Sequence, residues 1–144
     1  MVLLAVVVVL CVGGLGVGYV LYDKATEPDR TTPTVAVDQY LEAALVDRDD
    51  SRASLYTCGR SADMQAIKSL REEIEGIEHR YGIHVNVAWD KVTAEAGKAA
   101  TPVSARLRVQ VPEVNGQYSE SLQQWRFQTE KRSGWRVCGA ERLG

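Results

Sequence analysis

Two cysteines in the polar part of the chain are the residues whose chemistry the sequence defines best. Cys58 precedes Gly59, and Cys138 lies in the closing GWRVCG. A reactive thiolate needs a neighbouring base or a resolving thiol, and no histidine is near Cys138 in the sequence. Two cysteines exported together to an oxidising compartment most simply pair. We therefore predict a Cys58–Cys138 disulfide, with two buried free thiols or a redox-active pair as the alternatives.

The other groups that could do acid–base or metal chemistry are few. The chain has 2 histidines. His79 lies in the charged run EHR and is expected to face the end of a helix, whereas His84 alternates with apolar residues and is expected to face solvent. The sequence has no HxH, HExxH or CxxC, and its one glycine-rich run is apolar. We predict no catalytic residue, no metal site and no cofactor.

Aromatic side chains are the remaining candidates for a binding site. Aromatic residues at core spacing fill a core more often than they line a pocket, although an amphipathic ring suits either place. If the domain has a pocket, the residues expected to line it are Tyr40, Tyr56, Trp89 and Trp125.

An uncharged stretch, VLLAVVVVLCVGGLGVGYVLY, occupies residues 2–22. As a helix it would be about 31 Å long, close to the hydrocarbon thickness of a bilayer. No basic residue precedes it and no cleavage signal follows it. Leu10 stands before Cys11, where a lipobox needs a small residue. We predict an uncleaved, single-pass transmembrane signal anchor over 1–22; a cleaved signal peptide and a buried helix are the alternatives.

The rest of the chain reads as one domain on a short linker. Residues 23–32 form a polar linker, and residues 33–144 form a domain that we expect outside the cytoplasm, at the cell membrane. Thr32 followed by Pro33 is a typical helix start. The apolar spacing predicts a helix to about Arg48, a short second helix through Tyr56, and a third from Ser61 or Asp63 to Tyr81.

After Gly82 the apolar period changes from helical to two. This alternation predicts four strands, with turns at AGKAA, Asn115-Gly116 and Ser133-Gly134, over residues 83–96, 101–112, 117–131 and 134–142. One face of each strand is apolar, so the three helices should pack on one side of the sheet. The predicted fold class is α+β.

Charge argues against one class of partner. The chain carries 17 basic and 19 acidic residues, with a net charge of -2. A balanced chain offers no field that attracts nucleic acid, so we predict no nucleic-acid partner. The polar face of the sheet carries Arg106, Arg108 and Arg126. We expect a solvated outer face there, with a basic stripe that binds a partner or lipid headgroups as the alternative.

Three helices followed by a meander that ends WRFQTEKRSGWRVCG resemble the nuclear transport factor 2-like superfamily, whose fold is a cystatin-like roll. The ending is similar to that of membrane-anchored or secreted actinobacterial members, including proteins associated with mammalian-cell-entry (Mce) transport. Members commonly carry a short strand or hairpin between the second and third helices, where this chain has only CGRSAD.

The resemblance and the residues together favour a binding protein over an enzyme. The resemblance implies a non-catalytic accessory or scaffolding subunit of a cell-envelope assembly. Its expected partners are the membrane through residues 2–22, and an envelope protein or a second copy bound through the sheet. The alternative is a small-molecule or lipid-binding domain, of isomerase type, that uses the cone between helices and sheet.

Overall fold

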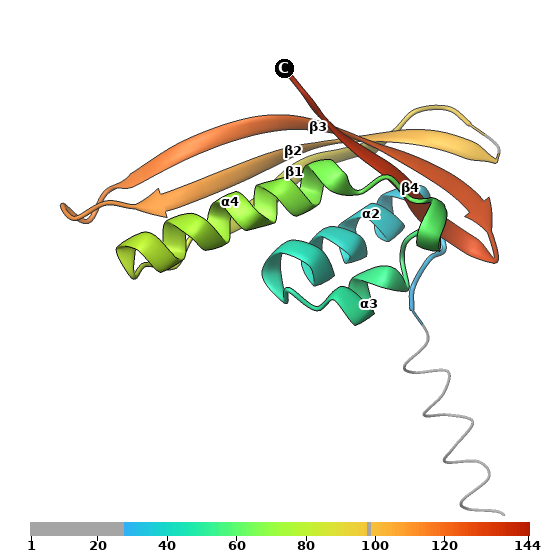
Figure 1. Ribbon diagram of the computed structural model, residues 1–144. Helices are drawn as coiled ribbons and strands as arrows, with labels where there is room; N and C mark the ends of the chain where they lie inside the picture. Colours follow the sequence, from blue (N-terminus) through green and yellow to red (C-terminus); the bar gives the residue numbers. More distant parts are fainter. Residues whose placement is uncertain (1–27, 98) are drawn as a thin grey trace, which may run out of the picture.

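The computed structural model of the chain describes residues 28–97 and 99–144. Its helices cover one face of a four-stranded antiparallel sheet and leave the other face open (Figure 1). The strand order is β1-β2-β3-β4, which is a meander. The predicted α+β class, with three helices on an antiparallel sheet, is confirmed. Within the described ranges no helix is long and apolar enough to cross a membrane, and the predicted anchor over residues 2–22 lies outside those ranges.

The helical layer begins at the residue that the sequence predicts. The Thr32 hydroxyl accepts a hydrogen bond from the Val35 N–H at 3.2 Å, and Pro33 follows at the first helical position. The long final helix ends at Gly82, whose φ of 64° is a left-handed conformation that glycine adopts without strain. The helical elements are α2 (Pro33–Leu41), η1 (Glu42–Val46, a π-helical turn), α3 (Asp50–Ser54), η2 (Gly59–Ser61, a 3-10 turn) and α4 (Gln65–Tyr81).

The sheet follows the predicted strands to within a few residues. Alternating burial along β2 and β3 matches the period of two in the sequence, because successive side chains of a strand point to opposite faces. The strands are β1 (Asn86–Ala94), β2 (Ala100–Pro112), β3 (Tyr118–Arg132) and β4 (Gly134–Leu143).

The core lies between the helices and the inner face of the sheet. Its largest fully buried side chains come from both layers, and they include Leu41, Ile67, Leu107, Trp125 and Phe127. One expectation from helical spacing is wrong. The spacing places Tyr81 in the buried stripe of the third helix, but the structure leaves it exposed in the last turn, beside the exposed tip of the β2–β3 hairpin.

The segment between α3 and α4 runs alongside strand β4. Thr57 and Asp63 make parallel bridges to Val137 and Gly139, so this stretch acts as a short extension of the sheet edge. Gln128 pairs with Gly139 and Thr129 with Val137, which leaves Cys138 as an extra residue in β4. Such a bulge changes the direction of a side chain. Here the bulge lies beside Cys58, whose N–H donates to the Val137 carbonyl at 2.9 Å.

Candidate functional site

The cone between helices and sheet is filled. Trp125 is 1% exposed and Phe127 is fully buried; their rings stack with centroids 6.3 Å apart. Tyr56 is buried in the same core, whereas Trp89 is partly buried and donates from Nε1 to the Asp38 carboxylate at 2.7 Å. Among the described residues the buried polar side chains are threonines, so no Asp, Glu or His lies in the core.

A cleft of about 570 Å³ opens within the helical layer instead. Of the four aromatic residues predicted to line a pocket, Tyr40 does so; Tyr56, Trp89 and Trp125 do not line this cleft. Its apolar wall is made by Ala44, Ala53, Ala62, Met64 and Ile67, and its polar rim by residues of α3 and α4. No described strand residue lines it, so the cleft is separate from the cone that the alternative function would use.

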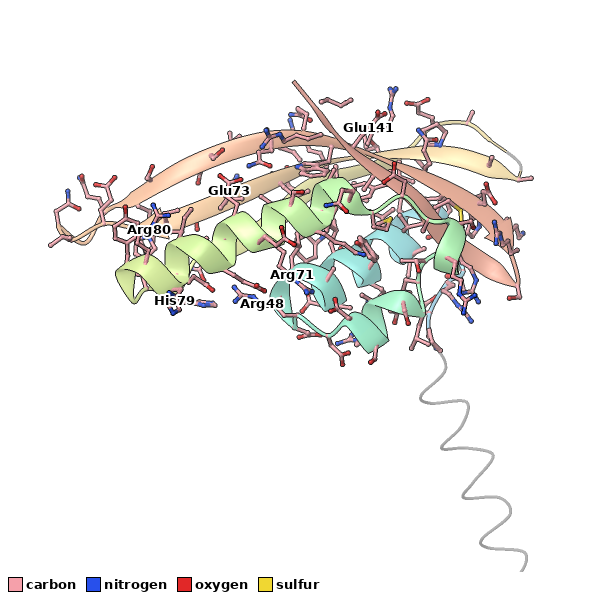
Figure 2. The ribbon with its side chains drawn as sticks, viewed as in Figure 1. Arg48, Arg71, Glu73, His79, Arg80 and Glu141 are labelled. Atoms are coloured by element: carbon pink, nitrogen blue, oxygen red, sulfur yellow. A yellow bond between two sulfur atoms is a disulfide. The ribbon has the colours of Figure 1, made fainter. Side chains whose placement is uncertain are left out.

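Charged side chains close one side of this cleft. Arg71 on α4 donates to both carboxylate oxygens of Asp50, at 2.7 and 3.2 Å, and also lies near Glu75. Figure 2 shows Arg71 on the side of α4 that faces the shorter helices. Tyr40 is only 4% exposed, and burial raises the pKa of its hydroxyl; Arg71 lowers that pKa by a smaller amount, and Asp50 raises it. A neutral hydroxyl beside an apolar wall can hydrogen-bond a small amphipathic molecule.

Near the C-terminal end of α4, Glu78 accepts hydrogen bonds from several separate segments of the chain. Its two carboxylate oxygens accept from Arg48 at 2.7 and 2.9 Å, and one of them also accepts from the Val85 N–H. The exposed His84 places Nδ1 3.0 Å from the same carboxylate. Glu78 therefore joins the end of η1, the C-terminal turn of α4 and the start of the sheet. The hydrogen bonds from Arg48 lower the pKa of Glu78.

This contact makes a prediction for the pH dependence of stability. Because the folded-state pKa of Glu78 lies below its unfolded value, its contribution is present above the unfolded pKa and is lost as the pH falls through the folded pKa. We expect Glu78→Gln to lower the free energy of unfolding by about 1 kcal/mol at pH 7, and by less at pH 3. Urea unfolding of both proteins at the two pH values measures this; an equal difference at both would contradict it.

The open face of the sheet carries ion pairs rather than a basic stripe. Arg106 holds Asp90 at 2.6 Å, Arg108 lies 3.4 Å from Glu120, and Arg126 lies 3.3 Å from Glu95. The predicted arginines are thus on this face but each has an acidic partner. The same face also exposes three apolar or aromatic side chains, Tyr118, Leu122 and Leu143.

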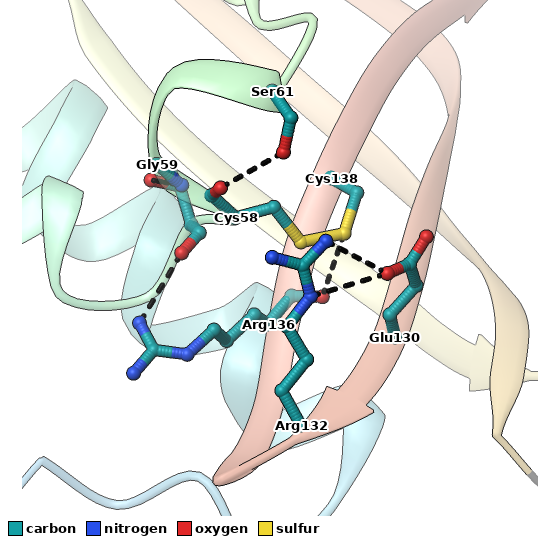
Figure 3. A network of polar contacts seen from close by, with 8 residues as sticks. Cys58, Gly59, Ser61, Glu130, Arg132, Arg136 and Cys138 are labelled. Carbon is teal, nitrogen blue, oxygen red and sulfur yellow. Dashed lines mark hydrogen bonds and ion pairs between the residues drawn. A yellow bond between two sulfur atoms is a disulfide. The ribbon is translucent and has the colours of Figure 1, made fainter.

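A disulfide joins Cys58 to Cys138 at the edge of the sheet. Figure 3 shows Arg132 over the bond, with its guanidinium held by Glu130 at 3.0 Å. The Glu130 carboxylate lies near both sulfurs. Because both sulfurs are in the disulfide, they offer a metal no thiolate.

Comparisons with known proteins show the fold. No family model matches the chain, and no curated protein sequence matches it. The association domain of CaMKII from C. elegans has a TM-score of 0.53 at 20% identity, over 76% of this chain and 92% of that one. Aln2 from a Streptomyces species has a TM-score of 0.54 at 15% identity, over 80% of this chain and 94% of that one. A protein of unknown function with a cystatin-like fold from Nostoc punctiforme has a TM-score of 0.52 at 8% identity, over 74% of this chain and 84% of that one.

At these identities the likeness concerns the fold alone. The resemblance that the sequence indicated is confirmed at that level, whereas the closer likeness to actinobacterial and Mce-associated members stays a prediction. Sequence reasoning named Tyr40 as a pocket residue but missed the other walls of its cleft, and it missed the Glu78 contacts. Each brings together residues from separate elements, and no local motif marks them.

Proposed function

The chain has the cystatin-like roll of the nuclear transport factor 2-like proteins, and from that premise we propose that it works by association rather than by catalysis. The domain is an accessory or scaffolding subunit of an envelope assembly, held outside the cytoplasm at the cell membrane by residues 2–22. The apolar length of that stretch supports the anchor. The precise assembly, including a lipid-handling transporter, rests on the resemblance of the closing hairpin.

The filled cone is the observation that carries this proposal. An isomerase-type site needs an enclosed carboxylate or imidazole with a pKa near the working pH. Here the cone holds Trp125, Phe127 and Leu107, and the acids and histidines of the described residues lie outside the core. Because the interior is packed, we assign binding to the outer surfaces of the domain.

The open face of the sheet is the surface that we assign to pairing with a second copy. A two-fold interface must be complementary to itself, and this face carries both signs of charge, as in the Arg106–Asp90 and Arg108–Glu120 pairs. Leu122 and Tyr118 supply exposed apolar area of the kind found at interface centres. The fold shared with a domain named for association agrees with this assignment.

Substitution of Leu122 tests the pairing. Leu122 is 53% exposed and would be buried between two copies. Leu122→Glu should weaken self-association more than about tenfold, because a carboxylate would lose its water in the interface. Sedimentation equilibrium of the full chain in neutral detergent, with wild type and variant side by side, measures the dissociation constant.

Val46→Glu is the matched control. Val46 is 48% exposed, but it lies in the helical layer, away from the open face of the sheet. This variant should associate like the wild type. A wild-type chain that sediments as a monomer at all concentrations would overturn the pairing, as would equal effects of the two substitutions.

A further inference from the structure

Three arginines gather where the described domain begins. Arg30 and Arg136 both donate from Nη1 to the Leu55 carbonyl, at 3.1 and 3.2 Å, so their guanidinium groups lie within a few ångströms of each other. Arg136 also donates to the Thr57 carbonyl at 3.3 Å. Arg132 is the third member, since burial lowers the pKa of Arg136 on the neighbouring strand and the charge of Arg132 lowers it further. Figure 3 shows the Arg132 guanidinium over the disulfide, held by Glu130. We call Arg30, Arg132 and Arg136 the arginine cluster.

Packing between the incoming chain and strand β4 fixes this arrangement. The Trp135 N–H donates to the Arg30 carbonyl at 2.9 Å. Gly134 has a φ of 101°, and a β-carbon there would lie 3.0 Å from the Arg30 β-carbon. A glycine is therefore required for Arg30 to lie against the start of β4. The closing hairpin supplies the other two arginines from either side of this glycine.

The cluster has more positive charge than its neighbours balance. Among the described residues no carboxylate forms an ion pair with Arg30 or Arg136, and Glu130 pairs with Arg132 alone. The pKa of Arg136 is lowered by burial and then by the charges of Arg30 and Arg132. The nearby Asp29 carboxylate is turned to Thr31. Arg30 Nε is buried without a hydrogen-bond partner. Arg30 and Arg136 are like charges held together without an acid of their own, and such a pair forms a site for an anion.

We infer that the arginine cluster binds the phosphate of anionic phospholipid headgroups. This inference rests on the proposed membrane anchor. If the anchor ends at Tyr22, residues 23–30 can extend at most about 28 Å, so Arg30 lies within that distance of the membrane surface and can reach its headgroups. Guanidinium groups bind phosphate oxygens through paired, charge-assisted hydrogen bonds. Each basic side chain near an anionic surface strengthens binding by roughly fivefold.

Lipid retention by the full chain tests this inference. The chain, purified in neutral detergent, is offered equal amounts of phosphatidylglycerol and phosphatidylcholine with the same acyl chains. Mass spectrometry then gives the ratio of the two lipids that remain bound after gel filtration. The wild type should retain phosphatidylglycerol over phosphatidylcholine by at least about fivefold. The double variant Arg30→Gln, Arg136→Gln should bring the ratio close to one.

Three controls make the result specific. Arg80→Gln removes an exposed arginine in the last turn of α4, outside both the cluster and the open sheet face, and should leave the ratio unchanged. Arg132→Gln tests the cluster without removing a bond to the Leu55 or Thr57 carbonyl, and should halve the preference or more. The charge-keeping pair Arg30→Lys, Arg136→Lys should restore most of it, which a loss of folding would not.

Two outcomes would overturn the inference. Equal retention of the two lipids by the wild type would do so. Loss of the lipid preference in 10 mM inorganic phosphate would assign the cluster to free phosphate instead, because this concentration is on the order of the dissociation constants of weak anion sites. The proposed anchor is tested separately: a chain that alkaline carbonate extracts from membranes is not anchored in them. The proposed pairing is tested by the sedimentation experiment above.

Discussion

Replacing Cys58 and Cys138 with alanine should lower the free energy of unfolding by about 4–5 kcal/mol. The two residues are 80 apart in sequence, so the bond closes most of the domain into one loop. An unfolded chain without this cross-link has far more conformations, and the loss of that restriction destabilises the folded state. For a domain whose total stability is on the order of 5–15 kcal/mol, a change of this size would leave it marginally folded.

Thiol labelling and urea unfolding measure this effect. The denatured wild type should label only Cys11 before reduction, and Cys58 and Cys138 as well after it. The unfolding midpoint should fall in reductant to that of the double variant. Cys11→Ala is the matched control, since it removes a thiol outside the predicted bond. Labelling of Cys58 and Cys138 before reduction would contradict the disulfide.

Phe127→Ala should destabilise the domain by about 3–5 kcal/mol. Phe127 is fully buried on β3, where it pairs with Val103 on one side and Ala140 on the other, and its ring stacks on Trp125. Truncation removes most of the ring from a packed interior and leaves a cavity that neighbouring side chains fill only partly.

Leu122→Ala is the control from the same strand. Leu122 faces the open side of the sheet, so its truncation should change the monomer's stability by less than about 0.5 kcal/mol. Urea unfolding at a protein concentration below the dissociation constant keeps self-association out of the comparison. Similar losses for the two variants would mean that the cone is not the tightly packed core described above.

Much of the fold could be predicted because local signals and tertiary packing agree. Thr32 and Pro33 start a helix and Gly82 ends one by their own backbone chemistry. The alternation along β2 and β3 specifies which face is buried, because a slip of one residue would turn every apolar side chain to water. Tyr81 shows the limit, since helical spacing marks a face of the helix but does not tell whether another element covers its last turn.

The sequence by itself determined the element order, the α+β class and the two cysteines available for pairing in the polar domain. Tertiary structure decided which residues of separate elements contact each other. The bulge at Cys138, the gathering of Arg30 with Arg136 and the closing of a cleft over Tyr40 each depend on segments far apart in the chain. A local pattern can set a helix or strand, because its period is a property of neighbouring residues. A site is a property of distances between elements, and packing alone fixes those distances.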